Sequence, residues 1–81
     1  MVKIYTKDYC PYCHKAKALL DSLGVKYQEI DVTNDPERLE EAIEKSGFRT
    51  VPQIFVGDKC LGGSDDIHRL HAEGRLLDLV K

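Results

Sequence analysis

The 81-residue sequence predicts an α/β domain in which helices cover both faces of a four-stranded mixed β-sheet. Two observations predict this fold class. Short apolar runs alternate with longer segments whose apolar residues recur at helical spacing, in the order β-α-β-α-β-β-α. Gly57-Asp58 lies between the last two strands and favours a tight antiparallel hairpin. The first β-α-β part implies a right-handed crossover between parallel strands, and helices on both faces bury such a sheet most simply.

The first strand and the first helix have clear boundaries. The run Val2–Thr6 is mostly apolar, which is typical of a buried strand. Pro11 favours the first turn of a helix, and Gly24 supplies its end. Residues 25–32 are expected to form the second strand, although the apolar alternation shifts phase near Glu29 and leaves the register open.

The second helix and the hairpin follow. Asn34-Asp35-Pro36 offers a cap and a proline, which open a helix that closes at Lys45 and Gly47. The third strand is predicted at residues 53–56 and the fourth at residues 59–61.

The last main helix follows a break at Gly62-Gly63. Ser64 is a suitable N-cap, and Asp65 and Asp66 place negative charge in the first turn, where it suits the helix dipole. Gly74 ends this helix, and a short apolar segment follows. We therefore expect one domain over residues 1–81 with the thioredoxin-like arrangement of strands and helices. The residues predicted to face its core include Leu19, Leu20, Leu39, Ala42, Ile43, Ile67 and Leu70.

Composition narrows the function classes. Hydrophobic residues make up 42% and charged residues 32%, the balance of an ordinary globular protein. A net charge of −2 gives no overall attraction to nucleic acid or to an anionic membrane. No apolar run is long enough to span a bilayer, and the strand pattern begins directly after Met1, without the apolar core of a signal peptide. We therefore expect a cytoplasmic protein without nucleic-acid or membrane partners. We also expect it to be a monomer.

Two of the three cysteines form a motif with redox character. An odd number of cysteines argues against a secreted scaffold, and in a reducing cytosol a disulfide is usually transient and catalytic. Cys10 and Cys13 form a C-x-x-C motif that follows a predicted strand and opens a predicted helix. Residues three apart on a helix have Cβ atoms about 5–6 Å apart, and a disulfide needs Cα atoms about 4.4–6.8 Å apart. The first helical turn therefore holds two sulfurs where a bond can form and break.

The helix start predicts unequal roles for the two sulfurs. We expect Cys10 to face solvent and Cys13 to be covered, because Ala16 continues the apolar stripe of the second cysteine. Free N–H groups and the positive end of the helix dipole favour a thiolate at the first cysteine, and Lys7 and Lys15 add positive charge. A stabilised thiolate is a good leaving group, which suits a protein that accepts a thiol and releases it quickly.

Two other interpretations of the C-x-x-C motif are a zinc site and a structural disulfide. Cys60, His14, His68 or His71 would have to complete the four ligands of a structural zinc site. The sequence has no second C-x-x-C motif, and the two residues between His68 and His71 do not match the usual H-x₃₋₅-H spacing. A purely structural disulfide conflicts with the expected compartment. We therefore expect no metal, and we interpret Cys60 as a packed thiol on the returning hairpin strand.

Three segments of the sequence resemble the glutaredoxins, which are thiol–disulfide oxidoreductases. Cys10-Pro11-Tyr12-Cys13 resembles the dithiol active site of that family, and Thr50-Val51-Pro52 resembles its cis-proline loop. Gly62-Gly63-Ser64-Asp65-Asp66 resembles its second glutathione-binding segment. The resemblance covers nearly the whole chain. It implies an enzyme that reduces protein disulfides and glutathione mixed disulfides, with glutathione as co-substrate and no tightly bound cofactor.

The resemblance also implies roles for individual residues. Cys10 would be the catalytic nucleophile, and Cys13 would be the resolving thiol. Val51 would pair its backbone with the cysteinyl unit of glutathione like an added strand, provided that its bond to Pro52 is cis. The start of the last main helix would hold the γ-glutamyl carboxylate. The implied glutathione-binding residues are Lys7, Tyr12, Arg49, Thr50, Val51, Pro52, Gly63, Ser64, Asp65 and Asp66.

Several of these residues also have purely structural explanations. Under the resemblance, Asp66 pairs with the γ-glutamyl ammonium, Lys7 and Arg49 meet the glycine carboxylate, and Tyr12 forms a wall of the groove. Acidic residues such as Asp65 and Asp66 also occur in the first turn of any well-capped helix. The two cations could equally be solvated surface charges, and the tyrosine could simply cover the first cysteine.

Two other functions remain open from the sequence. Ser46-Gly47-Phe48-Arg49 is similar to the glutaredoxin-like hydrogen donors of ribonucleotide reductase, which thioredoxin reductase serves directly. An iron–sulfur cluster carrier would use Cys10 and external glutathione across a dimer, but Pro11 and Cys13 are atypical of such carriers. The expected partners are therefore glutathione and disulfide-containing or glutathionylated proteins, with ribonucleotide reductase as one candidate.

Overall fold

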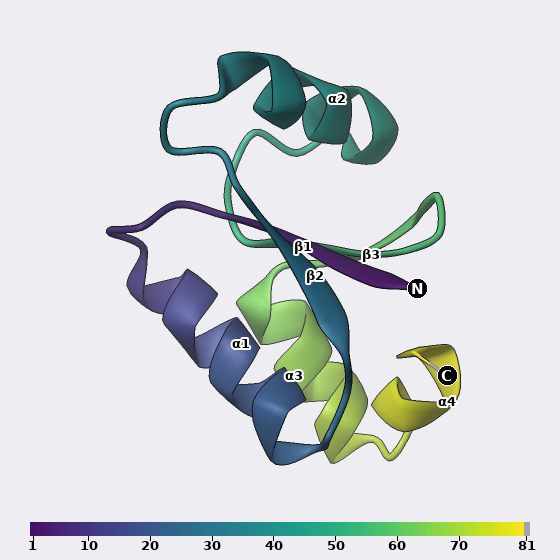
Figure 1. The fold of residues 1–81 in the computed structure, drawn as a ribbon. Helices are drawn as coiled ribbons and strands as arrows, with labels where there is room; N and C mark the ends of the chain where they lie inside the picture. The colour runs from purple at the N-terminus through teal and green to yellow at the C-terminus, as the bar shows by residue number, and fades with distance from the viewer. Residues whose placement is uncertain (81) are drawn as a thin grey trace.

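The computed structural model describes residues 1–80 and confirms the predicted fold class. In chain order the elements are β1 (Val2–Thr6), α1 (Pro11–Ser22), β2 (Tyr27–Asp31), α2 (Pro36–Ser46), β3 (Gln53–Val56), β4 (Lys59–Gly62), α3 (Ser64–Ala72) and α4 (Leu76–Val80). The four strands form one mixed sheet in the order β2-β1-β3-β4. β1 runs parallel to β2 and antiparallel to β3, and β3 and β4 form the antiparallel hairpin. Helices α1 and α3 lie on one side of the sheet and α2 lies on the other (Figure 1).

The second strand is shorter than predicted. β2 covers Tyr27–Asp31, and it pairs with β1 in parallel register with Tyr27 opposite Val2. It is an edge strand, and Ile30 is the one buried residue within it. A strand that leaves most of its side chains in solvent on both faces needs no strict apolar alternation, which explains the phase shift in this part of the sequence.

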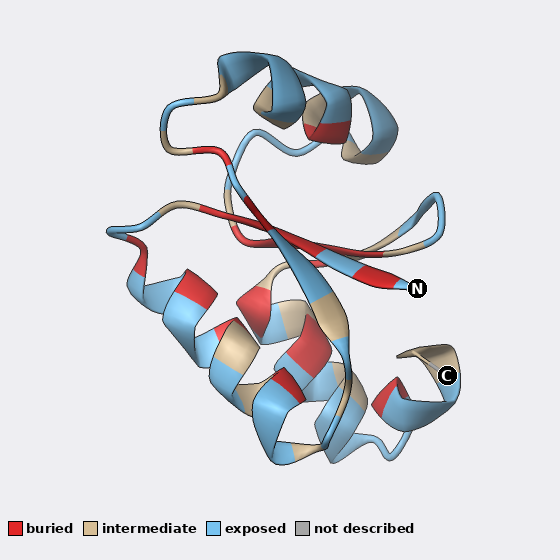
Figure 2. Cartoon of the chain, viewed as in Figure 1, coloured by how far each residue is buried: buried red, intermediate tan, exposed pale blue. Residues whose placement is uncertain are grey.

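Each face of the sheet carries a hydrophobic cluster. Successive side chains of a strand point to opposite faces, so Ile4 of β1 joins one cluster and Tyr5 joins the other. Figure 2 shows the buried positions gathered along the central strands and on the sides of the helices that face them. The larger cluster, with residues from α1, α3 and α4, contains Val2, Ile4, Ala16, Leu20, Ile54, Ile67 and Leu76. The smaller cluster, beneath α2, contains Tyr5, Ile30, Val32, Ala42 and Phe55.

The residues predicted for the core lie in or against these two clusters, with one exception. Ile43 is half-buried, but it belongs to neither cluster. The buried ones are Leu20, Ala42 and Ile67, and the half-buried ones that pack against a cluster are Leu19, Leu39 and Leu70.

The helices are short, and the ends of α2 follow the predicted signals. The longest helix, α1, has 12 residues, and no helix within residues 1–80 has both the length and the apolar composition needed to cross a membrane. Asp35 is the N-cap of α2 and accepts a hydrogen bond from the Arg38 N–H at 3.2 Å. Gly47 ends α2 with φ at 79°, a left-handed conformation that glycine adopts without a Cβ clash.

The smaller cluster depends on Phe55, which gives a test of the packing. Phe55 is 2% exposed, and its ring meets the Tyr5 ring edge-on with the centroids 5.5 Å apart. The Phe55→Ala substitution removes these contacts and leaves a cavity, so we expect the free energy of unfolding to fall by about 3–5 kcal/mol. Chemical denaturation followed by circular dichroism measures this loss.

The matched control is Leu77→Ala, because Leu77 is an exposed residue on α4. We expect this substitution to change the free energy of unfolding by no more than about 0.5 kcal/mol. Similar losses in the two variants would contradict the assignment of Phe55 to the core.

Candidate functional site

The two cysteines lie at the first turn of α1, as predicted. Cys10 is the N-cap residue with extended backbone angles, and Pro11 is the first helical residue. The Cys10 Sγ accepts a hydrogen bond from the Cys13 N–H at 3.2 Å. The sulfur thus takes the place of the side-chain oxygen that usually caps a helix, at the positive end of the helix dipole. Both cysteines are free thiols in this structure.

Cys10 is less exposed than predicted. The sequence pattern predicts that it faces solvent, whereas the residue is only 9% exposed and Cys13 is fully covered. The Cys10 Sγ lies 3.7 Å from the Val51 carbonyl oxygen, so the loop before β3 approaches the sulfur closely. This contact joins residues 41 positions apart in the chain, and local periodicity cannot predict it.

The two active-site cysteines have different surroundings. Burial raises the pKa of the Cys13 thiol to about 12, and the hydrogen bond with the Cys10 side chain acts in the same direction. The Lys7 backbone and the charge of Lys17 lower the pKa of Cys13. Cys13 is therefore protonated at neutral pH. Burial also raises the pKa of the Cys60 thiol, which is half-buried against the smaller cluster.

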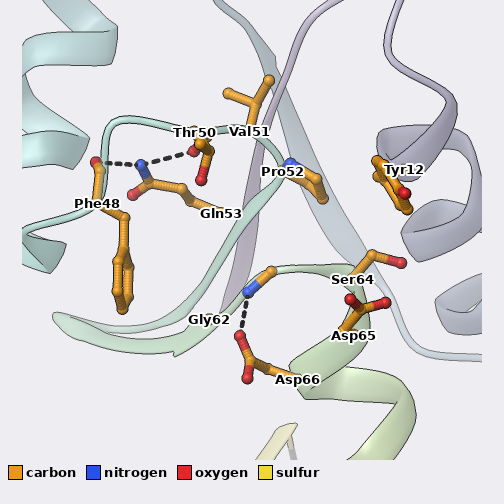
Figure 3. Close-up of a pocket in the computed structure, with 11 residues that line it drawn as sticks. Tyr12, Phe48, Thr50, Val51, Pro52, Gln53, Gly62, Ser64, Asp65 and Asp66 are labelled. Carbon is orange, nitrogen blue, oxygen red and sulfur yellow. Dashed lines mark hydrogen bonds between the residues drawn. The ribbon is translucent and has the colours of Figure 1, made fainter.

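A groove of about 310 Å³ lies beside the start of α1 (Figure 3). Neither cysteine is among its lining residues, but the groove is lined by Val51, whose carbonyl oxygen lies 3.7 Å from the Cys10 sulfur. Three segments that are distant in sequence form it: the first turn of α1, the loop that leads into β3, and the junction of β4 with α3. The Val51–Pro52 peptide bond in the loop is cis, as the resemblance implies. All the predicted glutathione-binding residues except Lys7 and Arg49 line the groove. The full lining is Tyr12, Phe48, Thr50, Val51, Pro52, Gln53, Gly62, Gly63, Ser64, Asp65 and Asp66.

Three lining residues, Phe48, Gln53 and Gly62, are absent from the predicted set of binding residues, although Gly62 belongs to the segment that carries the resemblance. Gln53 is 1% exposed, and its Nε2 donates to the carbonyl oxygens of Phe48 at 2.8 Å and Thr50 at 3.0 Å (Figure 3). The glutamine therefore holds the loop that forms one wall of the groove. A polar side chain in an otherwise apolar strand is the signal that points to such a role, because buried polar groups need partners.

The start of α3 differs from the prediction. Gly63 is the N-cap, and Ser64, which we expected in that role, is the first helical residue. The Asp66 carboxylate accepts hydrogen bonds from the Gly63 N–H at 2.9 Å and from Arg69 at 2.9 Å, so the aspartate secures the start of this helix. Gly62 has φ at 113°, and a Cβ there would collide with the Asp66 carboxylate. Glycine at this position thus allows the side chain to reach back over the helix start.

The two predicted cations are not among the lining residues. Lys7 is half-buried, with its Nζ 6.0 Å from the centroid of the exposed Tyr9 ring. Arg49 is exposed and lies between two lining residues in the chain. Tyr12, which does line the groove, is 55% exposed, and the Lys15 Nζ lies 5.4 Å from its ring centroid. Contact of either cation with a ligand carboxylate stays a prediction.

The residues considered for a zinc site are not gathered. Within residues 1–80, no group of three or more His, Cys, Asp or Glu side chains could hold a metal ion. His14 and His71 are exposed on their helices. The His68 Nδ1 lies 2.7 Å from the Ser64 carbonyl oxygen, one helical turn earlier. The histidines therefore have the ordinary surroundings of residues on a helix surface.

Curated proteins match nearly the whole chain, and a family model matches most of it. The glutaredoxin family model matches residues 2–61. Glutaredoxin 3 of Escherichia coli K12 is 51% identical over 80 residues, which cover 99% of this chain and 96% of that relative. The glutaredoxin of Pseudomonas aeruginosa is 48% identical over 75 residues, which cover 93% of this chain and 89% of that relative.

Solved structures show the same arrangement. The complex of buckwheat glutaredoxin with glutathione matches with a TM-score of 0.90 and 33% identity, covering 98% of this chain and 74% of that chain. Glutaredoxin from Brucella melitensis matches with a TM-score of 0.86 and 49% identity, covering 99% of this chain and 87% of that chain. The mixed sheet is therefore the thioredoxin-like sheet of these proteins. With its paired cysteines at a helix start and its relatives over nearly the full length, the chain belongs to the glutaredoxin family.

Proposed function

We propose that this thiol–disulfide oxidoreductase depends on glutathione and reduces protein disulfides and glutathione mixed disulfides. The observation that carries the proposal is the groove that reaches the Cys10 sulfur through Val51. Buckwheat glutaredoxin, which has a similar structure, forms a complex with glutathione. Glutathione would be a co-substrate, and the proposal requires no tightly bound cofactor.

The groove offers groups that complement each part of glutathione. The Val51 N–H has no hydrogen-bond partner within residues 1–80, so it can pair with the cysteinyl unit as in an added strand. The first turn of α3 presents backbone N–H groups that can hold the γ-glutamyl carboxylate. The Asp66 carboxylate already accepts two hydrogen bonds and can accept another from the γ-glutamyl ammonium.

The proposed reaction begins at Cys10. Its thiolate attacks one sulfur of the substrate disulfide, forms a mixed disulfide and releases the other sulfur as a thiolate, which takes up a proton. With a glutathione mixed disulfide, a second glutathione then attacks and regenerates the enzyme. With a protein disulfide, the Cys13 thiolate attacks the Cys10 sulfur, and two glutathione molecules later reduce the Cys10–Cys13 disulfide.

We propose that the expected location and partners accompany this function. The odd number of cysteines suits a reducing compartment such as the cytoplasm. The proposed protein substrates carry exposed disulfides or glutathione adducts, and ribonucleotide reductase is one candidate. We propose that the enzyme works as a monomer, because the groove and both cysteines belong to one chain.

Single cysteine variants test the proposed roles. Cys10→Ser should abolish turnover of a small glutathione mixed disulfide, because serine is not an adequate nucleophile at neutral pH. Cys13→Ser should keep this turnover and lose most of the reduction of protein disulfides, because only the second reaction needs the resolving thiol. Turnover is measured by coupling to NADPH through glutathione reductase. Full turnover by Cys10→Ser would contradict the nucleophile assignment.

The electron donor is tested with the same substrate in two reductase systems. Glutathione with glutathione reductase should support turnover, and thioredoxin reductase without glutathione should not. Activity that depends on thioredoxin reductase alone would contradict the proposed dependence on glutathione.

Asp66 tests the γ-glutamyl end of the groove. Asp66→Asn removes the negative charge but keeps an oxygen for the Gly63 N–H, so we expect KM for the mixed disulfide to rise about two- to fivefold with little change in kcat. Asp78→Asn removes an equal charge from α4, away from the groove lining, and should leave KM unchanged. An unchanged KM in Asp66→Asn would contradict the contact with the ammonium.

Gln53 tests the wall of the groove. Gln53→Glu replaces the amide donor by a carboxylate that would face the Phe48 and Thr50 carbonyl oxygens, so the loop should shift and KM should rise about tenfold. Gln28→Glu is the matched control, because Gln28 is exposed on β2. Equal KM values for the two variants would show that Gln53 does not shape the groove.

A further inference from the structure

Lys17 and Glu29 form an ion pair that lies outside the groove, one turn of α1 beyond Cys13. Lys17 follows Cys13 by four residues on α1, so the two side chains share one face of the helix. The Lys17 Nζ lies 3.0 Å from the Glu29 Oε2 on β2, and the Thr6 hydroxyl donates to the same oxygen at 2.8 Å. Because Thr6 is 1% exposed, the pair is anchored at the buried end of β1.

The lysine of this pair acts electrostatically on Cys13, the thiol that the resolving step must ionise. Cys13 is fully covered, and burial raises its pKa to about 12. The charged groups that act on Cys13 are Cys10, which opposes its ionisation, and Lys17, which favours it. The negative charges of Glu29 and Asp31 on β2 interact in turn with the positive charge of Lys17. The buried residues of α3, the helix that packs against α1, are the uncharged Ser64 and Ile67.

We propose that Lys17, held in place by Glu29, is a positioning residue for the resolving step and favours the Cys13 thiolate. The inference rests on the dithiol branch of the proposed function. In this step a bond forms between the Cys13 and Cys10 sulfurs, and the bond between Cys10 and the substrate sulfur breaks. The substrate leaves with the bonding electron pair and the Cys13 proton passes to water, so the enzyme thiols are oxidised and the substrate disulfide is reduced.

The two members of the pair should have opposite effects on the rate. Without the ammonium of Lys17, we expect the Cys13 thiolate fraction to fall about tenfold. The greater nucleophilicity of the more basic thiolate recovers about threefold, so Lys17→Met should slow the step about threefold. Glu29→Gln removes the opposing charge and keeps an oxygen for Thr6 and Lys17, so this variant should be about threefold faster.

The step can be observed directly with Ellman's reagent, without glutathione. The Cys10 thiolate displaces one thionitrobenzoate and forms a mixed disulfide, and Cys13 then displaces the second one. Stopped-flow absorbance at several pH values resolves the two phases. All variants carry Cys60→Ala, so that the third thiol does not react. Cys13→Ser should lose the second phase and thereby identifies it.

The matched control is Lys26→Met, because Lys26 is exposed and the substitution removes the same charge. We expect the second phase to be slower in Lys17→Met, faster in Glu29→Gln and close to the parent in the double variant, with the first phase and the control unchanged. The differences in second-phase rate between each variant and the parent should persist at each pH below the pKa of Cys13.

Three results would overturn the inference. They are an unchanged second phase in Lys17→Met, a second phase slowed equally by both single substitutions, and a first phase changed as much as the second. Equal slowing would show that the pair only supports the packing of α1 on the sheet. Because no glutathione is present, none of these results depends on whether the groove binds glutathione.

Discussion

The hydrogen bond from the Cys13 N–H to the Cys10 sulfur is the interaction on which the site depends. It places a sulfur at the N-cap of α1 and leaves the second sulfur one turn further along the same helix. The stripe that begins with Cys13 continues through Ala16 and Leu20 into the larger cluster. The redox pair is therefore positioned by the same packing that attaches α1 to the sheet, so the distance between the sulfurs does not depend on a flexible loop.

The groove beside the first turn of α1 has a different origin, because it exists only when three parts of the chain come together. β1 and β3 are neighbours in the sheet, so the loop before β3 arrives next to the start of α1. β4 then leads into α3, where the Asp66 carboxylate caps the helix and also lines the groove. Asp66 thus secures the start of α3 and also lines the groove. Its structural role as a cap and its proposed role in binding a ligand are therefore compatible.

Local signals explain what could be predicted from the sequence. Pro11, Gly47 and Gly57-Asp58 act through the conformations of their own backbones, so the order of helices and strands follows without knowledge of the tertiary structure. The covered state of Cys10 and the amide contacts of Gln53 depend on a loop that folds back over the site. Neither feature depends on periodicity. The sequence pattern therefore predicted wrongly that Cys10 is exposed, and it gave no indication of the contacts of Gln53.

The attachment of α2 has a consequence for the dynamics of the protein. Within Pro36–Ser46 only Ala42 is buried, whereas α1 buries three residues. Native proteins open first where few apolar contacts hold an element in place. Amide protons of α2 should therefore exchange with solvent earlier than those of α1, and such opening would loosen the adjoining loop without separating the two sulfurs. Substrate capture and thiol chemistry would then belong to different cooperative folding units of one small domain.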